Sequence, residues 1–159
     1  MTINIGLEES VRQQIAQHLG LILADMYVLY TKTLNFHWNM LDPRFYSLHL
    51  FLEKLYEEIA ENIDEVAERI RMLGEKAPAT LKKFVEMATL KESNDLISGE
   101  EMLLQLIQDH EALIRHLRDR IEDTDNLRDH GTSDLLIKFI RFHEKSAWML
   151  RSHFPQKGQ

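Results

Sequence analysis

Residues 36–49 read FHWNMLDPRFYSLH, and this stretch decides how the chain folds. Before it and after it, apolar residues recur every three or four positions, which is typical of two long amphipathic helices. Asp42 and Pro43 lie between these segments, and the residue before a proline avoids helical geometry. We therefore predict one helix over residues 8–39 and, after a tight turn, a second over residues 43–73, with Pro43 in its first turn.

The rest of the chain predicts two more long helices, over residues 98–125 and 132–154, joined by a short, polar and acidic loop. Residues 75–95 form a long connection that contains a short amphipathic stretch over residues 79–88. Four long helices with a short, a long and a short connection make an all-α, ferritin-like four-helix bundle. We expect the long crossover connection to carry a short helix.

Composition limits the class of protein. A chain of 159 residues is long enough for one domain with a real core, so we expect a single ferritin-like domain over residues 1–159. The absence of cysteine excludes disulfides and thiolate metal sites. No stretch resembles a signal peptide or a membrane span, so we expect a cytoplasmic protein. The formal net charge of −7 favours cations over the phosphates of nucleic acids.

Two histidines and two carboxylates form a set of metal ligands that one chain cannot bring together. His49 and Asp64 lie fifteen residues apart in the second helix, which is about 22 Å along its axis. Ligands of one iron lie within about 4–5 Å of each other. A second copy of this helix, packed antiparallel, would place His49 of one chain against Asp64 and Glu68 of the other. The tight turn brings His37 beside His49, and such imidazole and carboxylate ligands suit Fe(II).

Taken singly, each of these residues has a more common explanation. A lone histidine near an apolar stripe usually packs in the core or lies on the surface, and an Asp–Glu pair four residues apart is usually a solvated face. Di-iron ferritins use Glu-x-x-His motifs inside one bundle. No histidine here follows a glutamate by three positions, so we do not expect such a site. We expect the other histidines to be structural or surface residues, with His110 and His143 hydrogen-bonded in the core: His18, His110, His116, His143 and His153.

Two stretches resemble a known family. Residues 35–74, NFHWNMLDPRFYSLHLFLEKLYEEIAENIDEVAERIRMLG, resemble the signature region of Dps proteins, the mini-ferritins that protect bacterial DNA. Residues 123–154 resemble the last loop and helix of the same family. The resemblance implies a ferroxidase site on the two histidines and two carboxylates named above. It also implies that Glu53 is a further metal ligand, where the family most often has Asp, and that Trp38 lies beside the site.

The same resemblance implies a hollow dodecamer built from two-fold dimers, which Fe(II) enters through acidic three-fold pores. The matching loop implies that Asp125, Asp129 and Asp134 line the pore, with His130 where the family often has another acid. We expect a ferroxidase that oxidises Fe(II), with hydrogen peroxide as oxidant, and stores Fe(III). DNA-binding members often carry basic tails, whereas the first basic residue here is Arg12, so we expect weak or absent DNA binding.

Two other functions are compatible with the sequence. One is a structural or DNA-compacting shell whose metal site is weak or holds zinc, and metal analysis after iron loading would separate it from a ferroxidase. The other is a monomeric or dimeric helix bundle that binds a ligand or a partner. The size of the assembly in solution would distinguish this bundle from a dodecamer.

Overall fold

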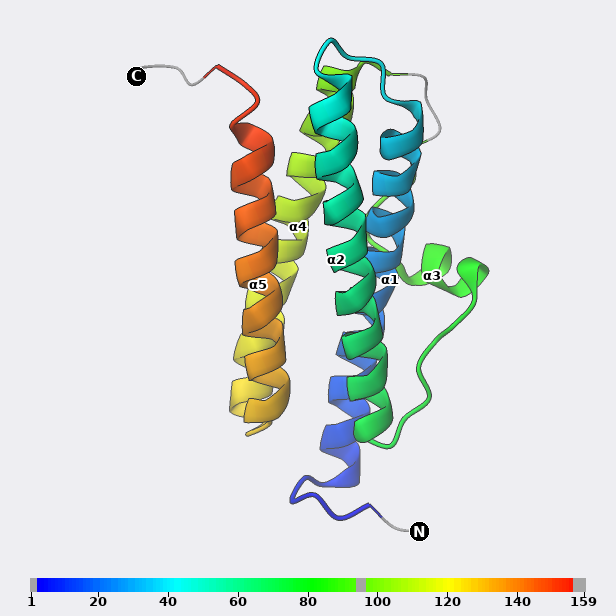
Figure 1. Ribbon diagram of the computed structural model, residues 1–159. Coiled ribbons are helices and arrows are strands. Elements are labelled where there is room, and N and C mark those ends of the chain that lie inside the picture. The colour runs from blue at the N-terminus through cyan, green and yellow to red at the C-terminus, as the bar shows by residue number, and fades with distance from the viewer. Residues whose placement is uncertain (1–2, 94–96, 156–159) are drawn as a thin grey trace.

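The computed structural model describes residues 3–93 and 97–155, and in these ranges it contains five helices and no strand (Figure 1). Four long helices run side by side, and a short helix lies in the crossover beside the first of them (Figure 1). The arrangement confirms the predicted all-α, ferritin-like fold. The helices are α1 (Glu9–Asn39), α2 (Phe45–Met72), α3 (Leu81–Met87), α4 (Gly99–Asn126) and α5 (His130–Arg151).

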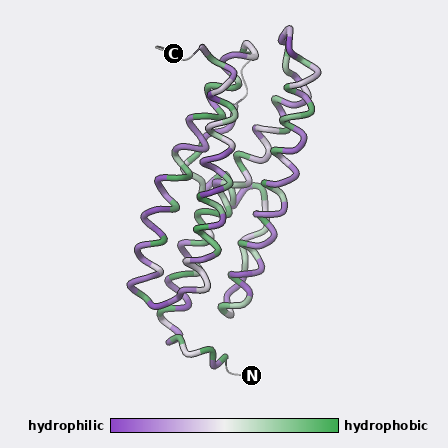
Figure 2. The backbone as a smooth tube through the Cα atoms, turned by 60° about the vertical axis from the view of Figure 1, so that its left-hand side comes forward, coloured by the Kyte–Doolittle hydropathy of each residue, from purple (hydrophilic) through white to green (hydrophobic). Residues whose placement is uncertain are grey.

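The helices α2, α4 and α5 each bury one face, whereas α1 packs against α2, α3 and α4 and is buried on all sides over residues 22–26. Figure 2 shows hydrophobic and hydrophilic residues alternating along the helices, as amphipathic periodicity requires. Nearly all of the predicted apolar positions lie in one continuous core. Phe45, the first residue of α2, is an apolar residue outside this core, because its side chain is 44% exposed. No helix within the described ranges is long and apolar enough to cross a membrane.

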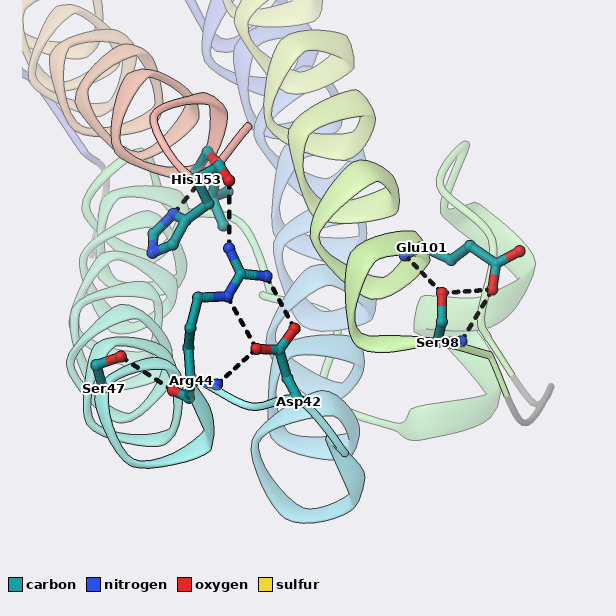
Figure 3. Close-up of polar contacts among 7 residues, drawn as sticks. Asp42, Arg44, Ser47, Ser98, Glu101 and His153 are labelled. Atoms are coloured by element: carbon teal, nitrogen blue, oxygen red, sulfur yellow. Dashed lines mark hydrogen bonds and ion pairs between the residues drawn. The ribbon is translucent and has the colours of Figure 1, made fainter. Parts of the chain in front are cut away.

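The turn between α1 and α2 differs from the prediction, because α2 begins at Phe45 and Pro43 lies outside it. Asp42 closes this turn. Its carboxylate accepts a hydrogen bond from the Arg44 N–H at 2.7 Å (Figure 3). Its carbonyl accepts one from the Phe45 N–H at 2.9 Å. The Arg44 guanidinium also binds this carboxylate, and these hydrogen bonds lower the pKa of Asp42 to about 2. Arg44 further reaches the carbonyl of His153, which ties the turn to the end of α5 (Figure 3).

A buried carboxylate holds the crossover against α1. Asp25, on α1, is 2% exposed and accepts hydrogen bonds from the Thr89 N–H at 2.6 Å and the Leu90 N–H at 2.9 Å. These residues directly follow α3, so the bonds fix the end of α3 beside α1. Tyr27 of α1 then stacks on Phe84 of α3, with ring centroids 4.1 Å apart.

The two predicted core histidines join α4 to α5. His110 and His143 are fully buried, and their Nδ1 atoms lie 2.8 Å apart. One Nδ1 must donate and the other accept, so the accepting ring is neutral and carries its proton on Nε2. Neither Nε2 has a hydrogen-bond partner among the described residues. Burial lowers the pKa of His110 to about 3, and burial together with His110 lowers the pKa of His143 well below its usual value.

We predict that acid destabilises the fold through this histidine pair. The unfolded state binds more protons than the folded state below about pH 6.5, so stability is lost as the pH falls below that value. The loss approaches about 1.4 kcal/mol per pH unit for each histidine. Urea unfolding at about pH 7.5 and about pH 5 measures it. The double variant His110→Leu/His143→Leu, which removes both partners together, should be much less sensitive to acid.

His153→Gln, outside the core, serves as the matched control and should keep the acid sensitivity of the parent chain. The same loss of stability in the double variant as in the parent would contradict the assignment.

Candidate metal centre

The last turn of α1 and the first turns of α2 hold two stacked histidines. The rings of His37 and His49 lie 3.8 Å apart at an angle of 18°. The Nδ1 of His37 lies 2.9 Å from the carbonyl oxygen of His49, and the Nδ1 of His49 lies 3.0 Å from the carbonyl oxygen of His37. Because a carbonyl can only accept, we assign the proton of each neutral ring to Nδ1. Each Nε2 then has a free lone pair, which is the form of imidazole that binds a metal.

Two aromatic side chains hold this pair in place. The ring of Phe45 lies 5.1 Å from that of His49, and Tyr56 contacts His37 edge-on at 5.2 Å. His37 is 6% exposed and His49 is half-buried. Sequence reasoning missed both aromatic residues as parts of the site. Their spacing could have indicated them, because Phe45 lies four positions before His49 and Tyr56 seven positions after it, and such positions share one face of a helix.

The predicted carboxylate ligands lie farther along α2. Asp64 and Glu68 are exposed and lie one turn apart, whereas Glu53 is half-buried and follows His49 by one turn. Since α2 is one unbroken helix, the separation of about 22 Å between His49 and Asp64 stands. Within the described ranges, no three or more metal-ligating side chains come together. One chain therefore brings His37 and His49 together and leaves Asp64 and Glu68 apart from them.

Large exposed apolar side chains surround the histidine pair. They lie on the last turn of α1, the connecting turn and the first turns of α2: Trp38, Leu41, Phe45, Tyr46 and Leu50. Trp38 directly follows His37 on α1, and its side chain is 67% exposed. A cluster of exposed apolar residues usually marks a contact with another protein. The surface around the histidines is therefore suited to a partner chain.

The three aspartates predicted to line a pore lie at the end of α4, in the loop and in the first turns of α5, and they differ in exposure. Asp125 and Asp134 are exposed, and His130 lies 3.7 Å from the carboxylate of Asp125. Asp129, which we expected to line a pore, is 4% exposed.

Asp129 is engaged inside the chain instead. Its carboxylate accepts hydrogen bonds from the N–H and the hydroxyl of Thr132 and forms an ion pair with Arg69 at 2.7 Å. These contacts cap the N-terminus of α5 and join it to α2. We therefore assign Asp129 to the helix cap rather than to a pore.

A ferritin-like domain matches residues 16–156. DNA protection during starvation protein 2 of Bacillus anthracis is 38% identical over 146 residues, which cover 92% of this chain and 100% of that protein. The chain belongs to the Dps family of ferritin-like proteins.

A solved structure and a further sequence relative are also similar to this chain. The crystal structure of a Dps protein from Vibrio cholerae, described as a member of a broad superfamily of ferritin-like diiron-carboxylate proteins, has a TM-score of 0.91 and 33% identity. The match covers 96% of this chain and 97% of that one. An uncharacterized low temperature-induced protein of Nostoc sp. is 45% identical over 152 residues, or 94% of this chain and 85% of that protein. The predicted family is thus confirmed.

We predict that Asp129→Ala destabilises this Dps fold by about 2–4 kcal/mol, because it removes a helix cap and leaves Arg69 without its partner. Asp134→Ala, at an exposed carboxylate near the start of α5, should change stability little. Chemical denaturation at a fixed protein concentration compares the two variants. Equal stabilities would show that the buried ion pair and cap contribute little.

Proposed function

We propose that this Dps protein is a ferroxidase that oxidises Fe(II) between two subunits and stores Fe(III) in a hollow dodecamer. Membership of the Dps and ferritin-like families supports a role in iron storage and in protection from oxidative stress. The main observation that supports the proposal is the geometry of the histidine pair. Two neighbouring imidazoles have their Nδ1 protons held by carbonyls, and each keeps its Nε2 lone pair for a metal.

The proposed site joins the two histidines of one subunit to the partner subunit's Asp64 and Glu68. Helix geometry supports this arrangement. If two copies of α2 pack antiparallel about a two-fold axis midway between His49 and Asp64, His49 of one chain lies opposite Asp64 of the other. The two-fold axis then passes near residues 57–58, where the small, half-buried Ala60 permits close approach. We propose Glu53 as a further ligand beside the histidines. So few protein ligands leave coordination positions open for an oxidant.

The carboxylates in this site favour Fe(III), since they stabilise the higher charge of the ion. We propose hydrogen peroxide as the oxidant, because it takes one electron from each of two Fe(II) ions without releasing a hydroxyl radical. The acidic net charge attracts Fe(II), and the exposed Asp125 and Asp134 are suited to an entry pore. The same charge supports weak or absent DNA binding.

Zinc is the alternative occupant of the proposed site, because imidazole and carboxylate ligands suit Zn²⁺ as well as Fe(II). In that case the protein would serve as a shell without ferroxidase activity. Metal analysis of the assembly after iron loading distinguishes the two functions, since only a ferroxidase accumulates ferric iron.

We predict that His37→Ala/His49→Ala lowers the rate of Fe(II) oxidation by peroxide at least about 10-fold. Losing a metal ligand should cost no less than losing a residue that only orients one. The rate is followed by the absorbance of the ferric product. Size-exclusion chromatography of the same samples shows whether the assembly is intact and has twelve times the mass of the chain.

His153→Ala, which removes a histidine outside the proposed site, should retain the rate of the parent protein. A parent-like rate in the intact double variant would place iron oxidation elsewhere.

A further inference from the structure

Three of the four tyrosines in the chain form a continuous row that begins at the histidine pair. Tyr56 of α2 contacts His37 edge-on, with ring centroids 5.2 Å apart. Tyr56 and Tyr30 pack at 6.2 Å and 78°, and Tyr30 and Tyr27 pack at 6.2 Å and 76°. Both geometries are the favourable edge-to-face contact of aromatic rings. The row thus crosses from α2 to α1 and ends under α3, where Tyr27 stacks on Phe84.

The far end of the row lies beside a carboxylate of the proposed metal site. Tyr27, Tyr30 and Asp64 line one hollow of about 420 Å³. In the proposed dimer, the two histidines of a chain serve one metal site and its Asp64 serves the other. Each chain therefore contains a row of phenols that leads from one of the two sites to the other.

The side chains along this row are suited to one-electron oxidation. The chain has no cysteine, so no thiol competes with its phenols. All three tyrosines are half-buried, which shields them in part from solvent.

We propose that the row of Tyr56, Tyr30 and Tyr27 carries one oxidising equivalent between the two metal sites of a dimer. This inference rests on the proposed ferroxidase function. It explains how two sites that have each been loaded with a single Fe(II) can share one molecule of hydrogen peroxide, which needs two electrons.

The electrons and protons of this reaction balance. At the first site, one Fe(II) and Tyr56 each give hydrogen peroxide one electron. The phenolic proton and one proton from solvent complete two water molecules, which leaves Fe(III) and a neutral tyrosyl radical. The radical moves to Tyr30 and then Tyr27 as each phenol gives up an electron and a proton and the previous ring regains them. At the second site, Fe(II) reduces the radical, which takes up a proton.

The test uses the assembled protein, loaded without oxygen with one Fe(II) per site and then mixed with half an equivalent of hydrogen peroxide. Rapid freezing and electron paramagnetic resonance detect the radical, and absorbance gives the iron oxidised per peroxide. Phenylalanine variants keep the packed rings and remove only the hydroxyl group. Tyr46→Phe is the matched control, because Tyr46 is the one tyrosine outside the row and is 76% exposed.

The expected result is a transient tyrosyl signal in the parent protein and in Tyr46→Phe. Tyr56→Phe should lose the signal, and its iron oxidised per peroxide should fall from two toward one. Tyr30→Phe should keep the signal and lengthen its lifetime, because the radical on Tyr56 then cannot move on. This opposite effect of two neighbouring substitutions distinguishes transfer along the row from a change in the fold.

A tyrosyl signal of parental size in Tyr56→Phe would contradict transfer along the row. The proposal of iron oxidation at the histidines would still stand. An indole radical in place of the tyrosyl signal would also overturn it. If the parent protein oxidises no iron with peroxide, the proposed function itself fails.

Discussion

An α-helix rises about 1.5 Å per residue, and α2 obeys this constraint from Phe45 to Met72 without a break. The proposed metal ligands are consequently divided between two groups that no bend of this helix can bring together. One group has the imidazoles of His37 and His49, held by carbonyls, and the other has the exposed carboxylates of Asp64 and Glu68. The proposed dimer, the sharing of each site and the role of the tyrosine row all depend on this separation.

The rest of the fold supports the histidine end of that helix. Asp42 and Arg44 shape the turn that lets α1 end beside the start of α2, which puts each histidine Nδ1 against the other residue's carbonyl. Asp25 fixes the crossover so that α3 covers the far end of the tyrosine row. Asp129 and Arg69 anchor α5 to α2. Most of the buried charge therefore stabilises the bundle and leaves the proposed ligands free.

The sequence predicts the helices well, because their apolar periodicity is long and rarely interrupted. It predicts His37 and His49 as neighbours because a turn of so few residues leaves no other arrangement. It could not distinguish Asp129 from Asp125, since a capping aspartate and a solvated one have the same chemistry until Arg69 is placed beside one of them. The tyrosine row could not be predicted from the sequence either. Its contacts join residues of three helices, whereas apolar periodicity describes each helix alone.

Mixed assemblies test the shared site most directly. One variant is His37→Ala/His49→Ala and the other is Asp64→Ala/Glu68→Ala, and each should be inactive alone. In a dimer with one chain of each kind, one site has both histidines and both carboxylates, and the other site has none of these four ligands. Random mixing should therefore restore about one quarter of the parental number of active sites, measured as the initial rate of Fe(II) oxidation by peroxide. If mixing restores no activity although the chains co-assemble, the ligands do not come from two chains.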